Sequence, residues 1–189
     1  MTLATRRGDL HDDYFHVPGT SLCQTCHQDR ALGWRTRQLD HPGTYADGTT
    51  DQIGHLIAAG VADVRPSPGI MLVDTFGDGG LDARARSYLD ANCANCHAAG
   101  GEAHGTSVLW DYGNTGPGAL PVCKNVESVA GAHFVIVPGA PLSSEFLARM
   151  SSPDPFVRMP QGPTHDPDEA AIAVLSEWVE AMTPAGCPQ

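Results

Sequence analysis

Cys93-Ala94-Asn95-Cys96-His97 and, seventy residues earlier, Cys23-Gln24-Thr25-Cys26-His27 are the two stretches that decide the fold. Each contains two cysteines separated by two residues, and a histidine follows the second cysteine directly. The two stretches hold four of the six cysteines in a chain of 189 residues. One chance occurrence of this spacing is rare and two are rarer, so the pattern predicts the same chemistry at both places.

The CxxCH spacing is typical of covalent haem attachment. The two thiols add to the two vinyl groups of the macrocycle, and the adjacent imidazole becomes an axial ligand of the iron. We therefore predict two haem c groups, each with its iron. The predicted attachment residues are Cys23, Cys26, Cys93 and Cys96, and the predicted iron ligands are His27 and His97.

Zinc, thioredoxin-like and disulfide chemistry fit the cysteine pairs less well. Zinc ribbons place their CxxC pairs about 15–20 residues apart and do not need the trailing histidine. A thioredoxin-like pair requires a βαβ pattern, and the chain does not alternate Val/Ile-rich strands with helices. A disulfide within one CxxC would close a very short, strained loop.

The segment after residue 80 has the clearest helical pattern. Leu81–Asn92 (LDARARSYLDAN) has helical spacing and contains no Gly or Pro, so a helix leads into the second motif. Asp166-Pro167-Asp168-Glu169 predicts the start of another helix. Its apolar stripe consists of Ala171, Ile172, Leu175, Trp178, Val179 and Met182. We expect this helix to pack on the first one and close a domain of residues 81–189.

The segment before residue 81 is a smaller haem-binding region, and it is not a copy of the second. Val17-Pro18-Gly19-Thr20 before its motif indicates a turn. A turn is also expected at 45–48, followed by a short helix with Ile53, Leu56 and Ile57 on one face and Gly60 at its end. The predicted division is therefore 1–80 and 81–189.

An electron-carrying haem iron needs a sixth ligand, and a thioether gives a higher reduction potential than a second imidazole. For the second haem we predict Met159, which lies in a Pro-rich loop before the last helix; Met150 is the alternative. For the first haem we predict Met71, with His41 and His55 as alternatives. The remaining histidines have no partner pattern and are expected to be exposed: His11, His16, His104, His133 and His165.

Cys123 and Cys187 remain outside the two motifs. Because haem c proteins mature in oxidising compartments, we predict a disulfide between these two cysteines. The alternative is two separate free thiols.

Charge and hydropathy restrict partners and location. The formal net charge of −11 argues against nucleic acid and anionic membrane surfaces and favours a basic or neutral redox protein. No stretch reaches the ~20 apolar residues of a membrane span. No export signal is visible at the start of the chain, although covalent haem attachment normally takes place outside the bacterial cytoplasm. We therefore expect a periplasmic or extracellular protein whose leader is missing from this sequence.

These features resemble the bacterial dihaem c-type cytochromes in which a small CxxCH region precedes a class I-like cytochrome c domain. The similar segments include Val17–Thr20, Leu32-Gly33-x-x-Thr36, 84–93 and 137–141, together with Arg149-Met150, Met159-Pro160 and the Trp178 helix. The resemblance implies an all-α, cytochrome c-like fold, with short helices and long loops around covalently attached haem. It also implies electron transfer outside the cytoplasm. Asp40-His41 replaces the asparagine expected there, which leaves His41 open as a ligand.

The predicted function is electron transfer with a dehydrogenase or another cytochrome as redox partner, and not enzymatic catalysis. The chain shows no Ser/His/Asp arrangement and no carboxylate pair that would indicate hydrolysis. Two alternatives stay open. One is a dihaem peroxidase-like enzyme in which one iron lacks a strong sixth ligand, and the other is the haem module of a larger dehydrogenase.

Overall fold

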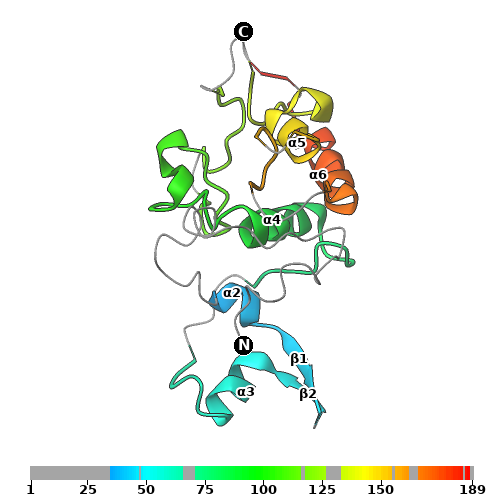
Figure 1. The fold of residues 1–189 in the computed structure, drawn as a ribbon. Helices are drawn as coiled ribbons and strands as arrows, with labels where there is room; N and C mark the ends of the chain where they lie inside the picture. Colours follow the sequence, from blue (N-terminus) through cyan, green and yellow to red (C-terminus); the bar gives the residue numbers. More distant parts are fainter. Residues whose placement is uncertain are drawn as a thin grey trace, which may run out of the picture.

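The structure is a computed structural model, and it describes residues 35–46, 48–65, 71–115, 118–126, 133–154, 156–161, 166–184 and 186–187. Along the chain the elements are α2 (Thr36–Leu39), β1 (Pro42–Tyr45), β2 (Gly48–Asp51), α3 (Gln52–Ala58), α4 (Leu81–Asn92), η2 (Glu102–Thr106), η3 (Pro141–Ser143), α5 (Glu145–Met150) and α6 (Glu169–Glu180), where η marks a 3₁₀ helix. Figure 1 shows the hairpin and α3 at one end of the molecule and α5 and α6 at the other, with α4 between them.

The prediction of an all-α, cytochrome c-like fold is wrong. The described residues include an antiparallel hairpin in which Pro42 pairs with Asp51 and Tyr45 with Gly48. β-Branched and aromatic residues favour these strands, and Gly48 adopts a φ of +130° at the turn. The sequence predicted only the turn, because the strands are four residues each and show no alternation of apolar residues: β2 is exposed throughout, and β1 half-buries only Gly43 and Tyr45. The fold is therefore mixed, with short helices and one small sheet.

The helices predicted in the second region are confirmed. Leu81–Asn92 is helical and is followed by Cys93, and α6 buries four residues of the predicted stripe, Ala171, Leu175, Trp178 and Val179; Ile172 and Met182 are partly buried, and Met182 lies beyond the end of α6. The cap differs from the prediction: α6 begins two residues later, with the Asp168 carboxylate accepting the Ala171 backbone N–H at 3.0 Å. The Trp178 indole N–H donates to Asp82 at 3.0 Å and ties the two helices together.

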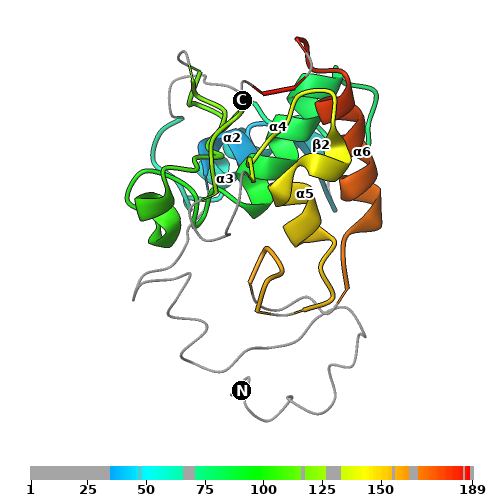
Figure 2. The same cartoon turned by 90° about the horizontal axis from the view of Figure 1, so that it is seen from above.

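One hydrophobic core lies between α4, α5 and α6, which Figure 2 shows side by side. Its buried side chains include Leu89, Ile136, Phe146, Leu175 and Trp178. The segment 118–126 joins this body through isolated β-bridges, among them Val122 with Ile136. The core lies wholly in the predicted second domain, where it supports the second CxxCH motif.

The predicted disulfide between Cys123 and Cys187 is present, with their Cα atoms 5.4 Å apart. Cys123 has a φ of +54°, and its backbone N–H donates to the Ile136 carbonyl at 2.9 Å. The disulfide therefore joins Cys187, near the end of the chain, to the segment 118–126.

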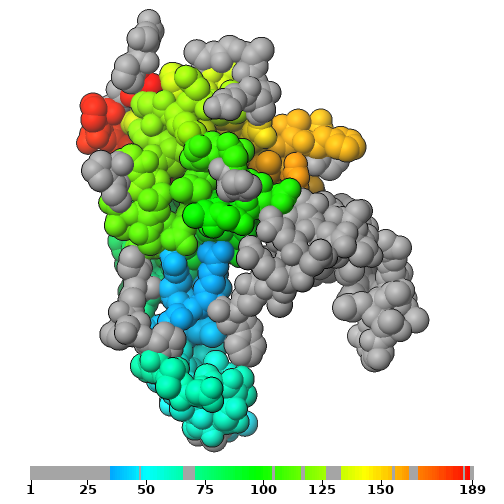
Figure 3. Space-filling view, turned by 90° about the vertical axis from the view of Figure 1, so that its left-hand side faces the viewer, coloured from blue at the N-terminus to red at the C-terminus, as the bar shows by residue number. Residues whose placement is uncertain are grey.

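Helix α2 connects the hairpin and α3 to this body, as the blue residues between the cyan and green parts of Figure 3 show. Helix α3 begins at Gln52. Asp51 caps it, and the Asp51 side chain accepts the Gly54 backbone N–H at 2.7 Å. Among the described residues, no helix is both long and apolar enough to cross a membrane.

Candidate functional site

The second CxxCH motif forms a tight turn at the end of α4. The backbone N–H groups of Cys96 and His97 both donate to the Cys93 carbonyl, at 3.2 and 2.9 Å. A side chain at Gly101 would collide with the Cys96 backbone carbonyl, so only glycine fits where the chain passes the turn. The turn brings both thiols and the imidazole to the wall of one cavity.

This cavity has a volume of about 500 Å³, which lies within the range of cofactor sites. Apolar side chains form most of its wall: Val108, Trp110, Val126, Val135 and Phe146. The rings of Trp110 and Phe146 lie 5.4 Å apart and are tilted by 47°. The volume and the apolar wall suit a large, mainly apolar ligand.

A hydrogen bond to a backbone carbonyl fixes the orientation of the His97 ring. Its ring Nδ1 lies 3.1 Å from the Val108 carbonyl, so Nδ1–H donates there and Nε2 keeps its lone pair. The backbone of the same residue is fixed by the Trp110 N–H, which donates to the His97 carbonyl at 2.8 Å. Burial lowers the pKa of His97; the hydrogen bond to Val108 opposes this effect, and the charge of Arg149 adds to it. The imidazole is therefore neutral at pH 7, as a metal ligand must be.

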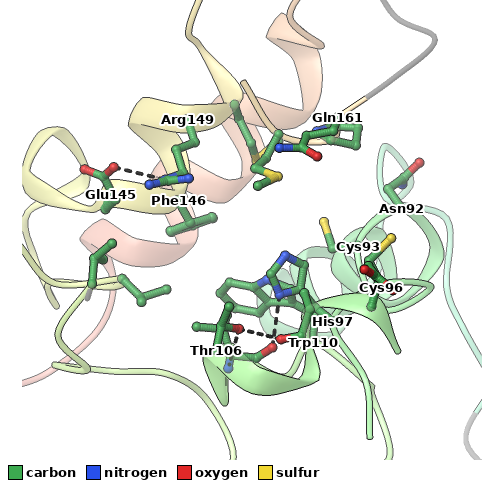
Figure 4. Close-up of a pocket in the computed structure, with 18 of the residues that line it drawn as sticks. Asn92, Cys93, Cys96, His97, Thr106, Trp110, Glu145, Phe146, Arg149 and Gln161 are labelled. Atoms are coloured by element: carbon green, nitrogen blue, oxygen red, sulfur yellow. Dashed lines mark hydrogen bonds and ion pairs between the residues drawn. The ribbon is translucent and has the colours of Figure 1, made fainter. Parts of the chain in front are cut away.

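Cys93 and Cys96 lie together at one edge of the cavity (Figure 4). Burial raises the pKa of the Cys93 thiol to about 12, and the neighbouring Cys96 adds to the rise. The thiol is thus protonated at neutral pH and resembles a buried, unreactive cysteine more than an activated nucleophile.

The two candidate thioethers both line the cavity. Met159 is half-buried and its backbone N–H donates to the Arg149 carbonyl at 3.1 Å. Met150 is 6% exposed and also belongs to the hydrophobic core. The structure therefore brings His97, both thiols and both methionines to one cavity, while the choice between Met159 and Met150 stays a prediction.

An ion pair on α5 lies at another edge of the cavity. Arg149 donates from Nε to a Glu145 carboxylate oxygen at 3.0 Å, one turn earlier on α5. Figure 4 shows this pair across the cavity from Cys93 and Cys96. The exposed His133 ring lies 3.6 Å from the same Glu145 carboxylate, so the carboxylate has a basic group on each side.

The first motif, Cys23, Cys26 and His27, lies outside the described residues, as do His11, His16 and His165 and the side chain of His104. Of its candidate sixth ligands, Met71 is 54% exposed. The His41 ring Nδ1 lies 2.8 Å from the Pro42 carbonyl, and His55 stacks on Tyr45 with ring centroids 3.6 Å apart. None of the three lines the cavity of the second motif, and the ligand of the first haem stays a prediction.

Sequence reasoning missed a cluster that joins α2 to the second motif. Arg35 donates to the carbonyl of Ala94, inside the CxxCH loop, at 3.1 Å. Arg37 donates at 3.0 Å to Asp90, a fully buried carboxylate on α4 that also accepts the Tyr112 backbone N–H at 2.8 Å. An acid on the helix that leads into the motif was the only signal, and its partner Arg37 lies 53 residues away in sequence.

Comparisons of this chain with protein-family models, with curated proteins and with solved structures return no match, so the function must be argued from the geometry of the cavity.

Proposed function

We propose that this chain is an electron-transfer protein with two covalently attached haems. The observation that carries the proposal is the convergence of two thiols, one neutral imidazole and a thioether on a single apolar cavity. The spacing of Cys93, Cys96 and His97 gives the attachment chemistry. The same spacing at Cys23, Cys26 and His27 supports a second haem, and the resemblance to dihaem cytochromes supports the same assignment.

The residues around the cavity fit haem better than they fit a zinc ion. His97 presents Nε2 because Nδ1 is held by a carbonyl, and the thiols sit at one edge instead of around one point. The described residues contain no group of three or more His, Cys, Asp and Glu side chains placed to share a metal ion. A structural zinc site commonly uses four such ligands.

A bound haem supplies a one-electron couple between ferric and ferrous iron. The residues of the chain supply the attachment points, the orientation of the axial imidazole and an environment that excludes water. Cys93 and Cys96 hold the macrocycle, and the Val108 carbonyl fixes the ring orientation and tautomer of His97. Trp110, Phe146 and the valines exclude water, which disfavours the more highly charged oxidised state and raises the reduction potential.

The location and partners are part of the proposal. The disulfide between Cys123 and Cys187 supports an oxidising compartment, such as the bacterial periplasm or the cell exterior. The charge of −11 supports a neutral or basic redox protein as donor or acceptor, such as a dehydrogenase or another cytochrome.

The direct test is a pyridine haemochrome assay combined with intact mass, on protein produced in an exporting host with haem-attachment machinery. We expect two covalent haems in the full chain and one after Cys93→Ala and Cys96→Ala. One haem in the full chain would leave a single-haem carrier. None would refute the proposal and return the cysteines to zinc or disulfide chemistry.

The sixth ligand is tested by Met159→Leu, with Met150→Leu as the matched control. Both changes replace a thioether with an apolar side chain of similar volume, so packing is affected little. We expect Met159→Leu to convert the second haem to a high-spin ferric spectrum and to lower its potential, while Met150→Leu leaves both unchanged. The reverse pattern would assign Met150, and no change in either variant would exclude both.

One observation favours the alternative, a dihaem peroxidase-like enzyme. Met71, the predicted sixth ligand of the first haem, is 54% exposed, and an exposed thioether is easily replaced by solvent. A first haem that is high-spin and binds cyanide or reacts with peroxide rapidly would support the enzyme. Two six-coordinate, low-spin haems would support the carrier.

A further inference from the structure

We propose that Arg149, held by Glu145, binds the carboxylate side chains of the haem at the second motif. The inference rests on the proposed function, since it concerns the orientation of the haem in the same cavity. It gives a role to Arg149 and Glu145, which the attachment of haem to the cysteines does not explain.

The geometry of the cavity carries the first step. Cys93 and Cys96 lie at one edge and the Arg149–Glu145 pair at the opposite edge (Figure 4). In the haem macrocycle, the two vinyl groups that react with thiols and the two propionates lie on opposite edges. Attachment at the cysteines therefore directs the propionates toward Arg149.

Arg149 is placed to act as a fixed donor. It lies on α5, with 22% of its side chain exposed, and Glu145 accepts its Nε–H at 3.0 Å from one turn earlier. This contact fixes the guanidinium plane at the cavity wall. A guanidinium has five N–H donors, and its planar geometry matches that of a carboxylate.

A cation is needed at this edge for an electrostatic reason. The wall is mainly apolar, and carboxylates that enter such a cavity lose hydration unless a donor replaces it. Arg149 is the single Lys or Arg among the described residues that line the cavity, while Glu102 and Glu145 also line it. Without Arg149, the propionates would meet the Glu145 carboxylate, and no other Lys or Arg of the described residues lines the cavity.

The experiment compares two ligands that differ only in these carboxylates, ferric haem and its dimethyl ester. It uses the full-length chain, changed so that haem binds reversibly at the second site and cannot bind at the first motif. The required changes are Cys23→Ala, Cys26→Ala, His27→Ala, Cys93→Ala and Cys96→Ala. Dissociation constants are measured by absorbance titration with Arg149 in place and with Arg149→Gln.

The matched control is Arg86→Gln. Arg86 lies 4.5 Å over the Tyr112 ring and donates to the carbonyls of Tyr112 and Asn114, and it does not line the cavity. We expect Arg149→Gln to weaken ferric haem on the order of tenfold, the effect of losing one charge-assisted hydrogen bond at a partly exposed site. The ester should change less than twofold, and Arg86→Gln should change neither. Equal weakening of both ligands, or of neither, would overturn the inference.

A second measurement covers the case in which the alanine background binds no haem. The resonance Raman bands of the propionates are compared in covalently loaded wild type, Arg149→Gln and Arg149→Lys. We expect a shift in the glutamine variant that lysine partly restores, and identical bands in all three would overturn the inference. Absence of covalent haem in the wild type would instead refute the proposed function, so the two failures are distinguishable.

Discussion

Replacing Asp90 with asparagine tests whether α2 is held on the second motif by charge. The Asp90 side chain is fully buried, and Arg37 lies 3.0 Å away with 26% of its own side chain exposed. At an effective dielectric constant of about 20, a pair at this distance interacts by roughly 5 kcal/mol before desolvation is subtracted. Breaking a fully buried pair costs about 3–5 kcal/mol, and the partial exposure of Arg37 lowers the expected cost to about 2–3 kcal/mol.

Asparagine keeps an oxygen that can accept the Tyr112 backbone N–H, so the loss is mainly that of the charge. The assay is urea unfolding of the haem-loaded protein at neutral pH, followed by circular dichroism, with an unchanged slope as the check on two-state behaviour. Asp111→Asn is the control, since that carboxylate lies 3.2 Å from Arg37 but is 31% exposed. It should cost less than about 1 kcal/mol.

The reasoning would be refuted by an Asp90→Asn variant within about 0.5 kcal/mol of the wild type, a change typical of surface sites. It would also be refuted if Asp111→Asn were equally costly. A double-mutant cycle with Arg37→Gln separates the pair from other effects. Coupling near zero would mean that the carboxylate is stabilised by its backbone contacts alone.

Three further predictions concern stability and loading. Cys123→Ser with Cys187→Ser should lower the free energy of unfolding by up to about 4 kcal/mol, because the bond closes a loop with a sequence separation of 64; an unchanged melting temperature would contradict this. Burial, and then the adjacent Asp168 carboxylate, raise the pKa of Tyr88. The stabilisation of the folded state by the Tyr88 hydroxyl is therefore complete below pH ~10 and is lost as the pH rises further. Tyr88→Phe should therefore cost about 1 kcal/mol at pH 7 and less at pH ~11 in urea titrations; an equal cost at both would exclude this linkage. Gly101→Ala should reduce haem attachment at the second motif because its methyl group meets a backbone carbonyl, while Gly80→Ala, where the added carbon meets nothing within 4 Å and which does not line the cavity, should load normally by intact mass.

The parts of the fold that could be predicted are those with local signals. Leu81–Asn92 has no helix breaker, and α6 has an acidic cap followed by an amphipathic stripe, so both were found within two residues of their observed ends. The hairpin at 42–51 was missed because its strands are four residues each, β2 is exposed throughout, and the half-buried face of β1 consists of only Gly43 and Tyr45. A period-2 pattern of apolar residues needs a longer strand with one buried face.

The candidate site divides in the same way. The residues of the motif are contiguous in sequence, so their chemistry could be predicted from spacing alone. Trp110 and Asp90 could not, because the first supports His97 through its backbone and the second depends on arginines more than fifty residues away. Long-range pairs of this kind leave no periodicity and no motif in a single sequence.

The cluster at Asp90 bears on how two haems would work as one relay. Arg35, the residue before α2, donates to the carbonyl of Ala94, inside the second CxxCH loop, so the start of α2 contacts the proposed haem site directly. Only seven residues lie between His27 and Arg35, and the eight steps from one Cα atom to the other extend over at most about 29 Å. Loosening α2 by Asp90→Asn would remove this upper limit on the separation between His27 and the loop. If electron exchange between the haems depends on that limit, the variant should slow it while both haems remain attached, and flash photolysis of the loaded protein would measure the rate.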